Sequence, residues 1–172
     1  VQKTVATITG LPMNAVEVDV ARLGGGFGGK EDQATAWACL ATLGALHTGK
    51  PVRIRLDRRD DMRITGKRHP YSADFRLGLD DAGNFIAYEA TFFQNAGATA
   101  DLSTAILERS LFHATNAYFI PNVRVTAASC RTKLPSNTAF RGFGAPQAIF
   151  VLESAIRAAA RQRRVPASDL QS

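Results

Sequence analysis

The chain has 172 residues, a length that suits one domain with a sizeable core or a piece of a larger protein. Its 21 Lys and Arg residues exceed its 15 Asp and Glu residues by 6, but the main basic cluster (residues 53–68) is interleaved with acids and lacks stacking aromatics, so we expect no nucleic-acid binding. Because no apolar run could span a membrane and no signal-peptide pattern opens the chain, we expect a cytoplasmic protein without membrane contact.

The first predicted elements surround a glycine-rich turn. Val16 to Leu23 alternates apolar and polar residues, which predicts a strand with one buried face. The turn Gly24–Gly29 follows, and Asp32 to Leu46 is an Ala- and Leu-rich segment that predicts a helix. Val52 to Leu56 alternates again and predicts a second strand, so the first part of the chain is expected to form a βαβ-like unit.

The second part of the chain predicts a hairpin followed by further helices and a strand. The hairpin surrounds Asp80–Asn84, a segment rich in residues that accept left-handed backbone geometry. The predicted elements are the strands Ser72–Leu79, Phe85–Phe93 and Val123–Ala128 and the helices Ala105–Phe112 and Ala148–Arg164. Together these elements predict the α+β class, with a sheet that is mixed rather than wholly parallel.

The two cysteines predict neither a metal site nor a disulfide framework. Cys39 and Cys130 are far apart in the sequence and lack the spacing of zinc or iron–sulfur ligands. Cys39 lies in an apolar run and is expected to be a buried thiol. No pair of the three histidines suggests a metal site either.

The glycine-rich turn matches two phosphate-binding patterns imperfectly. Gly24-x-Gly26-x-x-Gly29 fits the dinucleotide fingerprint, and the same glycines followed by Lys30 fit a P-loop. Glu31 stands where a P-loop has Ser or Thr, and a carboxylate there would repel phosphate. The turn alone therefore leaves three hypotheses: a nucleotide-binding loop of either kind, or glycines chosen only for tight packing.

Two further segments narrow these hypotheses. They are Ile106–His113 (ILERSLFH) and Asn137–Gln147 (NTAFRGFGAPQ). Together with Gly24–Glu31, and in the same order, they resemble the molybdopterin-binding subunit of xanthine dehydrogenases in the molybdenum hydroxylase family. The resemblance covers nearly the whole chain and implies that residues 1–172 are part of a molybdopterin-binding domain, incomplete at both ends.

The resemblance implies which residues lie beside the cofactor. The backbone amides of Gly26, Phe27 and Gly28 are expected to contact the molybdenum–molybdopterin. Phe140 and Arg141 are expected to close on the cofactor from another side, with the backbones of Phe27 and Arg141 near the metal. Bare glycine backbone suits this task, because it can approach an anionic ligand closely.

The resemblance also implies a purine site. Glu31 matches the substrate-orienting glutamate, and Arg109 matches the arginine that stabilises charge on the purine, so these two residues are the expected catalytic pair. Phe143 is expected to stack on the flat ring, and Leu102 to line the same pocket. A carboxylate and a planar guanidinium can together recognise a ring that carries both carbonyl oxygens and N–H groups.

The implied reaction is oxidative hydroxylation of hypoxanthine or xanthine towards urate. Iron–sulfur clusters and FAD on partner subunits or domains would pass electrons to NAD, in a hetero-oligomer. The family's general-base glutamate would follow Ser172 and its apical glutamine would precede Val1, so the chain alone is expected to be inactive. Aldehyde oxidases have similar loops but lack the Glu–Arg pair, and an aldehyde oxidase is one alternative.

Two hypotheses of a different class compete with a molybdenum enzyme. A P-loop-like or Rossmann-like nucleotide-binding module would have no redox chemistry, and a non-catalytic relative would serve only in assembly. Taken singly, Glu31 could be an ordinary acid in a first helical turn, Arg109 a surface residue and Phe143 a core residue. Only the combination of the three motifs favours the molybdenum hydroxylase hypothesis.

Overall fold

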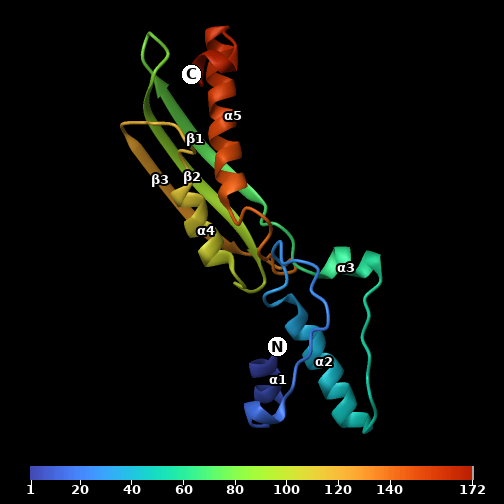
Figure 1. The fold of residues 1–172 in the computed structure, drawn as a ribbon. Coiled ribbons are helices and arrows are strands. Elements are labelled where there is room, and N and C mark those ends of the chain that lie inside the picture. The colour runs from blue at the N-terminus through green and yellow to red at the C-terminus, as the bar shows by residue number, and fades with distance from the viewer. Residues whose placement is uncertain (172) are drawn as a thin grey trace.

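In the computed structural model, which describes residues 1–171, a three-stranded sheet and two helices form one body and the first 70 residues form an arm (Figure 1). The sheet consists of β1 (Tyr71–Leu79), β2 (Phe85–Gly97) and β3 (Val123–Arg131), in that order. β1 pairs with β2 antiparallel and β2 pairs with β3 parallel. The predicted hairpin and the predicted mixed sheet are confirmed.

Two helices cover one face of this sheet. α4 (Ser103–Phe112) forms the crossover between the parallel strands and lies along β3, and α5 (Ala145–Arg163) lies along β1 (Figure 1). β2 turns its even-numbered residues to the helices, so that Tyr88, Ala90 and Phe92 are buried against Leu152 and Ile156 of α5. Both predicted helices and the third predicted strand are confirmed, and they carry the hydrophobic core.

The arm contains three helices and no strand within the described residues. They are α1 (Gln2–Thr9), α2 (Gln33–Thr48) and α3 (Arg58–Ile64), with a short 3₁₀ turn at Met13–Ala15. A second short 3₁₀ turn, Ala167–Leu170, follows α5 in the body. α2 confirms the predicted helix, whereas α1 and α3 were not predicted. The predicted strands Val16–Leu23 and Val52–Leu56 are wrong. No strand pairs with either segment within residues 1–171, so the βαβ-like unit does not form there.

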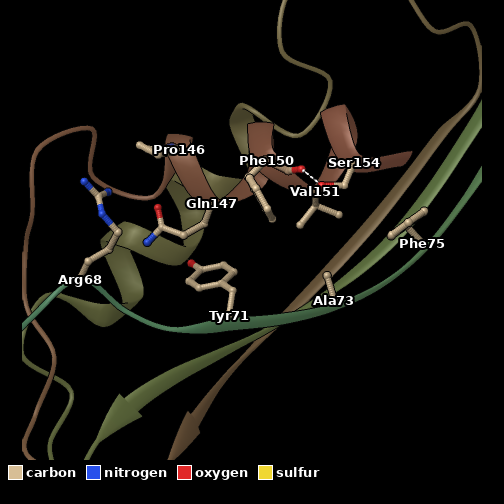
Figure 2. Close-up of a pocket in the computed structure, with 9 residues that line it drawn as sticks. All are labelled: Arg68, Tyr71, Ala73, Phe75, Pro146, Gln147, Phe150, Val151 and Ser154. Carbon is tan, nitrogen blue, oxygen red and sulfur yellow. Dashed lines mark hydrogen bonds between the residues drawn. The ribbon is translucent and has the colours of Figure 1, made fainter. Parts of the chain in front are cut away.

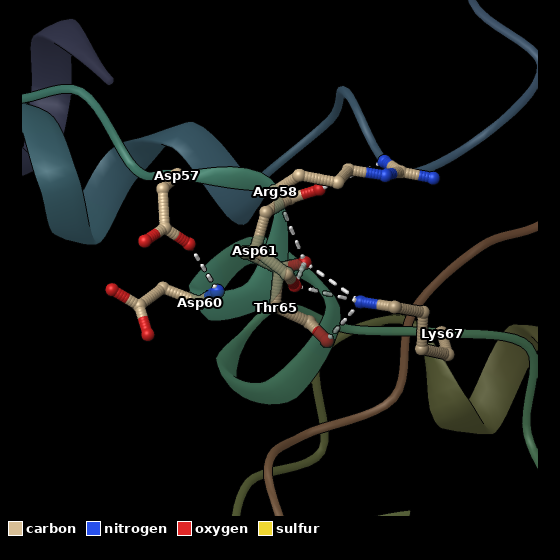
Figure 3. Close-up of polar contacts among 6 residues, drawn as sticks. All are labelled: Asp57, Arg58, Asp60, Asp61, Thr65 and Lys67. Atoms are coloured by element: carbon tan, nitrogen blue, oxygen red, sulfur yellow. Dashed lines mark hydrogen bonds and ion pairs between the residues drawn. The ribbon is translucent and has the colours of Figure 1, made fainter.

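α3 shows why the basic cluster includes a helix. The Asp57 side chain accepts a hydrogen bond from the Asp60 N–H at 2.8 Å and caps the N-terminus of α3 (Figure 3). The acidic residues in the first turn also stabilise this end of the helix, because their negative charge interacts favourably with the helix dipole. At the other end, Lys67 Nζ donates to the carbonyl oxygens of Asp61 (3.1 Å) and Thr65 (2.8 Å). This cation closes the helix and fixes the segment that leads into β1.

Much of the arm is apolar yet uncovered. α2 has no buried residue, and Leu40, Leu43 and Leu46 are all exposed. Cys39, expected to be buried, is only partly buried because it lies on this helix. A helix that is apolar on all sides is normally enclosed by other protein.

Candidate functional site

The glycine loop holds its shape without using its own N–H groups. Gly24, Gly25, Gly28 and Gly29 all have positive φ, between 68° and 99°, which glycine adopts readily. The Lys30 ammonium bends back and donates to the carbonyl oxygens of Leu23 and Gly25. The N–H groups of Gly24–Gly29 donate to no protein acceptor within residues 1–171. The loop therefore presents a row of free donors, while its lysine is used internally rather than for a phosphate.

The second loop lies directly against the first. A Cβ on Gly28 would meet the Ala139 carbonyl oxygen at 2.6 Å and the Phe140 nitrogen at 2.8 Å, so only glycine allows this approach. The Arg141 guanidinium lies 6.0 Å from the centre of the Phe27 ring. The sequence-predicted cofactor residues of the two loops are therefore brought together, at the junction of arm and body (Figure 1).

Both loops place a phenylalanine in an unusual backbone conformation. Phe27 has φ 55° and Phe143 has φ 50°, in the left-handed region that bulky residues rarely adopt. Phe27 is 66% exposed, and Phe143 closes a turn by donating its N–H to the Phe140 carbonyl oxygen at 2.8 Å. Such backbone strain concentrates at functional sites, where the surrounding structure holds it.

Arg68 fixes the second loop from the side of the sheet. Its Nη2 donates to the Arg141 carbonyl oxygen at 2.6 Å, and its guanidinium lies 4.6 Å from the centre of the Phe140 ring. A cation over an aromatic face is attracted by the ring quadrupole. From the sequence, Arg68 was only a member of the basic cluster, and nothing in that cluster distinguished it from its neighbours.

Hydrogen bonds among buried groups connect α4 to the end of the second loop. Ser110 Oγ donates towards the carbonyl oxygens of Gly144 and Ile106, both at 3.0 Å, and lies 2.8 Å from Tyr71 Oη. Gln94 Nε2 donates to the same tyrosine oxygen at 3.0 Å. Burial raises the pKa of Tyr71, so the phenol stays protonated and remains a donor. This chain of hydrogen bonds fixes α4, which carries Arg109, relative to the loop that carries Phe143.

The predicted substrate residues are placed on separate elements. Glu31 lies two residues before α2 and is exposed, and Arg109 is exposed near the end of α4. Neither side chain forms an ion pair or hydrogen bond within residues 1–171. Leu102, half-buried, is the N-cap residue of α4. Both charged groups are thus available for a ligand, since no partner within the described residues neutralises them.

One buried histidine lies behind α4. His69 Nε2 lies 2.7 Å from Ser103 Oγ, and burial lowers the pKa of His69 although the negative charge of Asp101 acts in the opposite direction. The imidazole is therefore neutral near pH 7. His69 itself lies two residues before β1, which begins at Tyr71.

An apolar cavity of about 470 Å³ lies elsewhere, between α5 and β1 (Figure 2). Tyr71 and Phe75 form its floor, while Gln147 and Phe150 come from α5. None of the sequence-predicted site residues lines it. We assign the site to the two loops instead, because they present free donors and the cavity is walled mainly by carbon.

The residues present suit a large anionic cofactor better than a directly ligated metal ion. No group of three or more His, Cys, Asp or Glu side chains within residues 1–171 could hold a metal. A Cβ on Gly26 would meet nothing within 4 Å, so the space beside the free amides is open to a ligand. Backbone N–H groups in such a concave turn are known anion-binding elements.

Comparison with known proteins supports the same assignment. The chain is 51% identical over 152 residues to xanthine dehydrogenase/oxidase of Rattus norvegicus, covering 88% of this chain and 11% of the relative. It is 45% identical over 159 residues to aldehyde oxidase 2 of Cavia porcellus, covering 92% of this chain and 12% of the relative. The chain thus spans about a ninth of the length of these relatives.

A solved structure shares the fold. Quinoline 2-oxidoreductase from Pseudomonas putida 86 superposes with a TM-score of 0.82 at 25% identity, over 99% of this chain and 22% of that chain. No helix within residues 1–171 has the length and apolar character needed to cross a membrane. Residues 1–172 match the model of the molybdopterin cofactor-binding domain, and the chain belongs to this family.

Proposed function

We propose that this chain is part of a xanthine dehydrogenase and holds the molybdenum cofactor beside a purine. The observation that carries the proposal is the pair of loops. The amides of Gly24–Gly29 have no acceptor within the described residues, and the loop is pinned against Ala139 and Phe140 by an approach that only Gly28 permits. Similarity to xanthine dehydrogenase/oxidase supports the choice of reaction.

Each loop has a separate task in this proposal. The amides of Gly26, Phe27 and Gly28 donate to the anionic cofactor, and Phe140 and Arg141 close on it from another side. When bound, the molybdenum–molybdopterin supplies the redox chemistry that adds oxygen to the substrate carbon. The protein contributes fixed donors that need no reorganisation during the reaction, which is the main source of electrostatic catalysis.

The purine would lie between the two loops and α4. Arg109 donates from a planar fork to the carbonyl side of the ring and stabilises the negative charge that develops there, while Glu31 accepts from the ring N–H groups or shares a proton. Phe143 stacks on the ring, with Leu102 as an apolar neighbour. Removal of a charge-stabilising donor from such a site costs about 3–4 kcal/mol in the transition state.

The rest of the enzyme would surround the arm. The uncovered apolar residues of α2 favour enclosure by protein outside this chain. Iron–sulfur clusters and FAD on other subunits or domains, NAD as acceptor, a hetero-oligomeric assembly and a cytoplasmic location belong to the same proposal. The general-base glutamate and the apical glutamine would also come from outside residues 1–172.

The test uses the full-length protein. Molybdenum and pterin are measured first, and bound ATP or NAD without molybdenum would favour a nucleotide-binding module instead. The double variant Glu31→Val with Arg109→Met is then compared with wild type on xanthine and on a small aldehyde. Xanthine turnover should fall at least 100-fold while aldehyde turnover is retained or rises. Equal loss of both activities would contradict the role of the pair.

The second candidate function is that of an aldehyde oxidase, which the 45% identity to aldehyde oxidase 2 favours. The same experiment separates the two candidates. A wild-type protein that oxidises aldehydes but not xanthine, with Glu31 and Arg109 both intact, would establish the second candidate.

A further inference from the structure

One carboxylate and the amide side chain bonded to it join four segments around the candidate site. Asp101 Oδ1 accepts from the Leu102 N–H at 2.6 Å and from Thr138 Oγ1 at 2.8 Å. Asp101 Oδ2 accepts from Gln33 Nε2 at 2.8 Å. Gln33 Oε1 in turn accepts from the Gly66 N–H at 2.7 Å. We call these hydrogen-bonded side chains and backbone groups the Asp101 junction.

Three of the four segments of the junction continue to proposed site residues. Gln33 is the first residue of α2, two positions after Glu31. Leu102 is the N-cap residue of α4, whose rise of about 1.5 Å per residue places Arg109 roughly 10 Å along the same helix. Thr138 lies two positions before Phe140 and also donates its N–H to the Lys67 carbonyl oxygen at 3.0 Å. The distances among the site residues therefore depend on one junction.

The backbone at Asp101 and at Gly66 is constrained by the packing of the junction. Asp101 has φ 45°, in the left-handed region that Asn and Asp tolerate better than other non-glycine residues. Gly66 leaves no room either, since a Cβ there would meet the Ser136 carbonyl oxygen at 2.7 Å and Gln33 Nε2 at 2.8 Å. Half-buried Asp101 receives three donors, and hydrogen bonds to a charged acceptor are about twice as strong as neutral ones.

We propose that Asp101, through its hydrogen bond to Gln33, is a positioning residue that sets the spacing of Glu31, Arg109 and the Phe140–Phe143 loop. The inference rests on the proposed function for its effect on catalysis, and on geometry alone for its effect on the loops. Asp101 contacts the proposed site through Leu102, Thr138 and Gln33, whose hydrogen bonds its carboxylate accepts. It acts through them and is not a catalytic residue.

The test exchanges the amide and the carboxylate. In Asp101→Asn, the new NH₂ group is a hydrogen-bond donor that must face another donor, either Gln33 Nε2 or the groups of Leu102 and Thr138. If the Gln33 amide rotates to present its oxygen to this NH₂ group, its own Nε2 then faces the Gly66 N–H, which is also a donor. In Gln33→Glu, two carboxylates face each other. The double variant Asp101→Asn with Gln33→Glu restores every donor–acceptor pair with the original total charge. Asn also keeps the left-handed backbone of residue 101 available.

The four proteins are compared as full-length enzymes by kcat/KM for xanthine and by amide hydrogen exchange of Gly66, Leu102 and Thr138. Each single variant should lose at least tenfold in kcat/KM and exchange these amides at least tenfold faster. The double variant should return to within about threefold of wild type in both measurements. Asp81→Asn, an exposed carboxylate in the β1–β2 turn, serves as the control and should match wild type.

Three results would overturn the inference. They are single variants that behave as wild type, a double variant no better than the singles, and a double variant that recovers slow exchange but not activity. If wild type binds no molybdenum and does not oxidise xanthine, the proposed function fails. The exchange measurements then still decide whether Asp101 and Gln33 hold the loops, because they need no cofactor.

Discussion

Residues 71–171 and residues 1–70 are held together in different ways. In the first of these regions, β2 and α5 bury complete side chains such as Phe92 and Leu152, both with no exposed area. In the second, the only buried apolar residues are Val5 and Ala6, and α2 leaves its leucines in solvent. The candidate site lies where the two regions meet. The body thus supplies a rigid support, whereas the arm brings its glycine loop to that support through a small number of specific contacts.

Two leucine-to-alanine substitutions compare the regions most directly. Leu152→Ala should lower the free energy of unfolding by about 3–4 kcal/mol, because it leaves a cavity in the core. Leu46 is 61% exposed, so Leu46→Ala should cost less than about 1 kcal/mol in the 172-residue chain. Urea unfolding followed by circular dichroism measures both. Similar costs would mean that the arm packs as tightly as the body.

A glycine pair tests the contact between the regions. Gly28→Ala should cost about 2–3 kcal/mol, since alanine is strained at φ 86° and its Cβ would meet the Ala139 carbonyl oxygen at 2.6 Å. Gly26→Ala is the matched control in the same loop, because its Cβ meets nothing within 4 Å. In full-length protein, Gly28→Ala should also lower the molybdenum content. Equal unfolding midpoints for the two variants would show that the loops do not depend on this approach.

The same contrast explains what the sequence could predict. The body was predicted from periodicity and turn residues, because its strands pair with each other and its helices cover them within the chain. Val16–Leu23 and Val52–Leu56 have an equally clear alternation, but they form no strands because pairing requires a neighbour that residues 1–171 do not supply. Periodicity indicates extended backbone and a buried face, and it cannot indicate where the partner lies.

The residues of the candidate site also fall into a group that the sequence predicted and a group that it did not. The glycine loop and the Phe140–Phe143 loop were predicted because their motifs are local in the sequence, and the structure brings them together. Asp101, Gln33 and Arg68 were missed, since their contacts with other segments join residues 33 to 73 positions apart. The Asp101-Leu102-Ser103 segment before a predicted helix was the one available signal, because Asp is a common residue where a helix begins.

A smaller effect is expected from a buried hydroxyl in the body. Tyr88 is 1% exposed and its Oη has no hydrogen-bond partner within residues 1–171, so Tyr88→Phe should stabilise the chain by about 1 kcal/mol. Burial raises the pKa of Tyr88 from 10.0 to about 12, so the folded state keeps its proton after the unfolded state has lost it. Between pH 10 and 12 the stability of the wild type should therefore fall more steeply than that of Tyr88→Phe, by about 1 kcal/mol per pH unit.

Unfolding of both proteins at several alkaline pH values measures this difference. Tyr71 and Tyr118, whose pKa values are also raised by burial, are present in both proteins, so the comparison isolates Tyr88. Parallel pH profiles for the two proteins would mean that the Tyr88 hydroxyl reaches water or another acceptor, and that the core of the body is less dry than its side-chain exposure indicates.

The smallest effect is expected on the face of the sheet that α4 and α5 do not cover, because side chains there are exposed to solvent, as they are in the arm. Glu89 on β2 lies between Arg76 on β1 and Arg124 on β3, with both N–O distances 3.8 Å, and all three side chains are at least 45% exposed. Solvent screens such pairs, so Glu89→Gln should cost less than about 0.5 kcal/mol and the difference should disappear in about 1 M NaCl. Urea unfolding of the two proteins at low and high salt measures it. A cost above about 1 kcal/mol that persists in salt would show that this face of the sheet is shielded from water. The body would then be covered on both faces of its sheet, and this face would not resemble the uncovered arm.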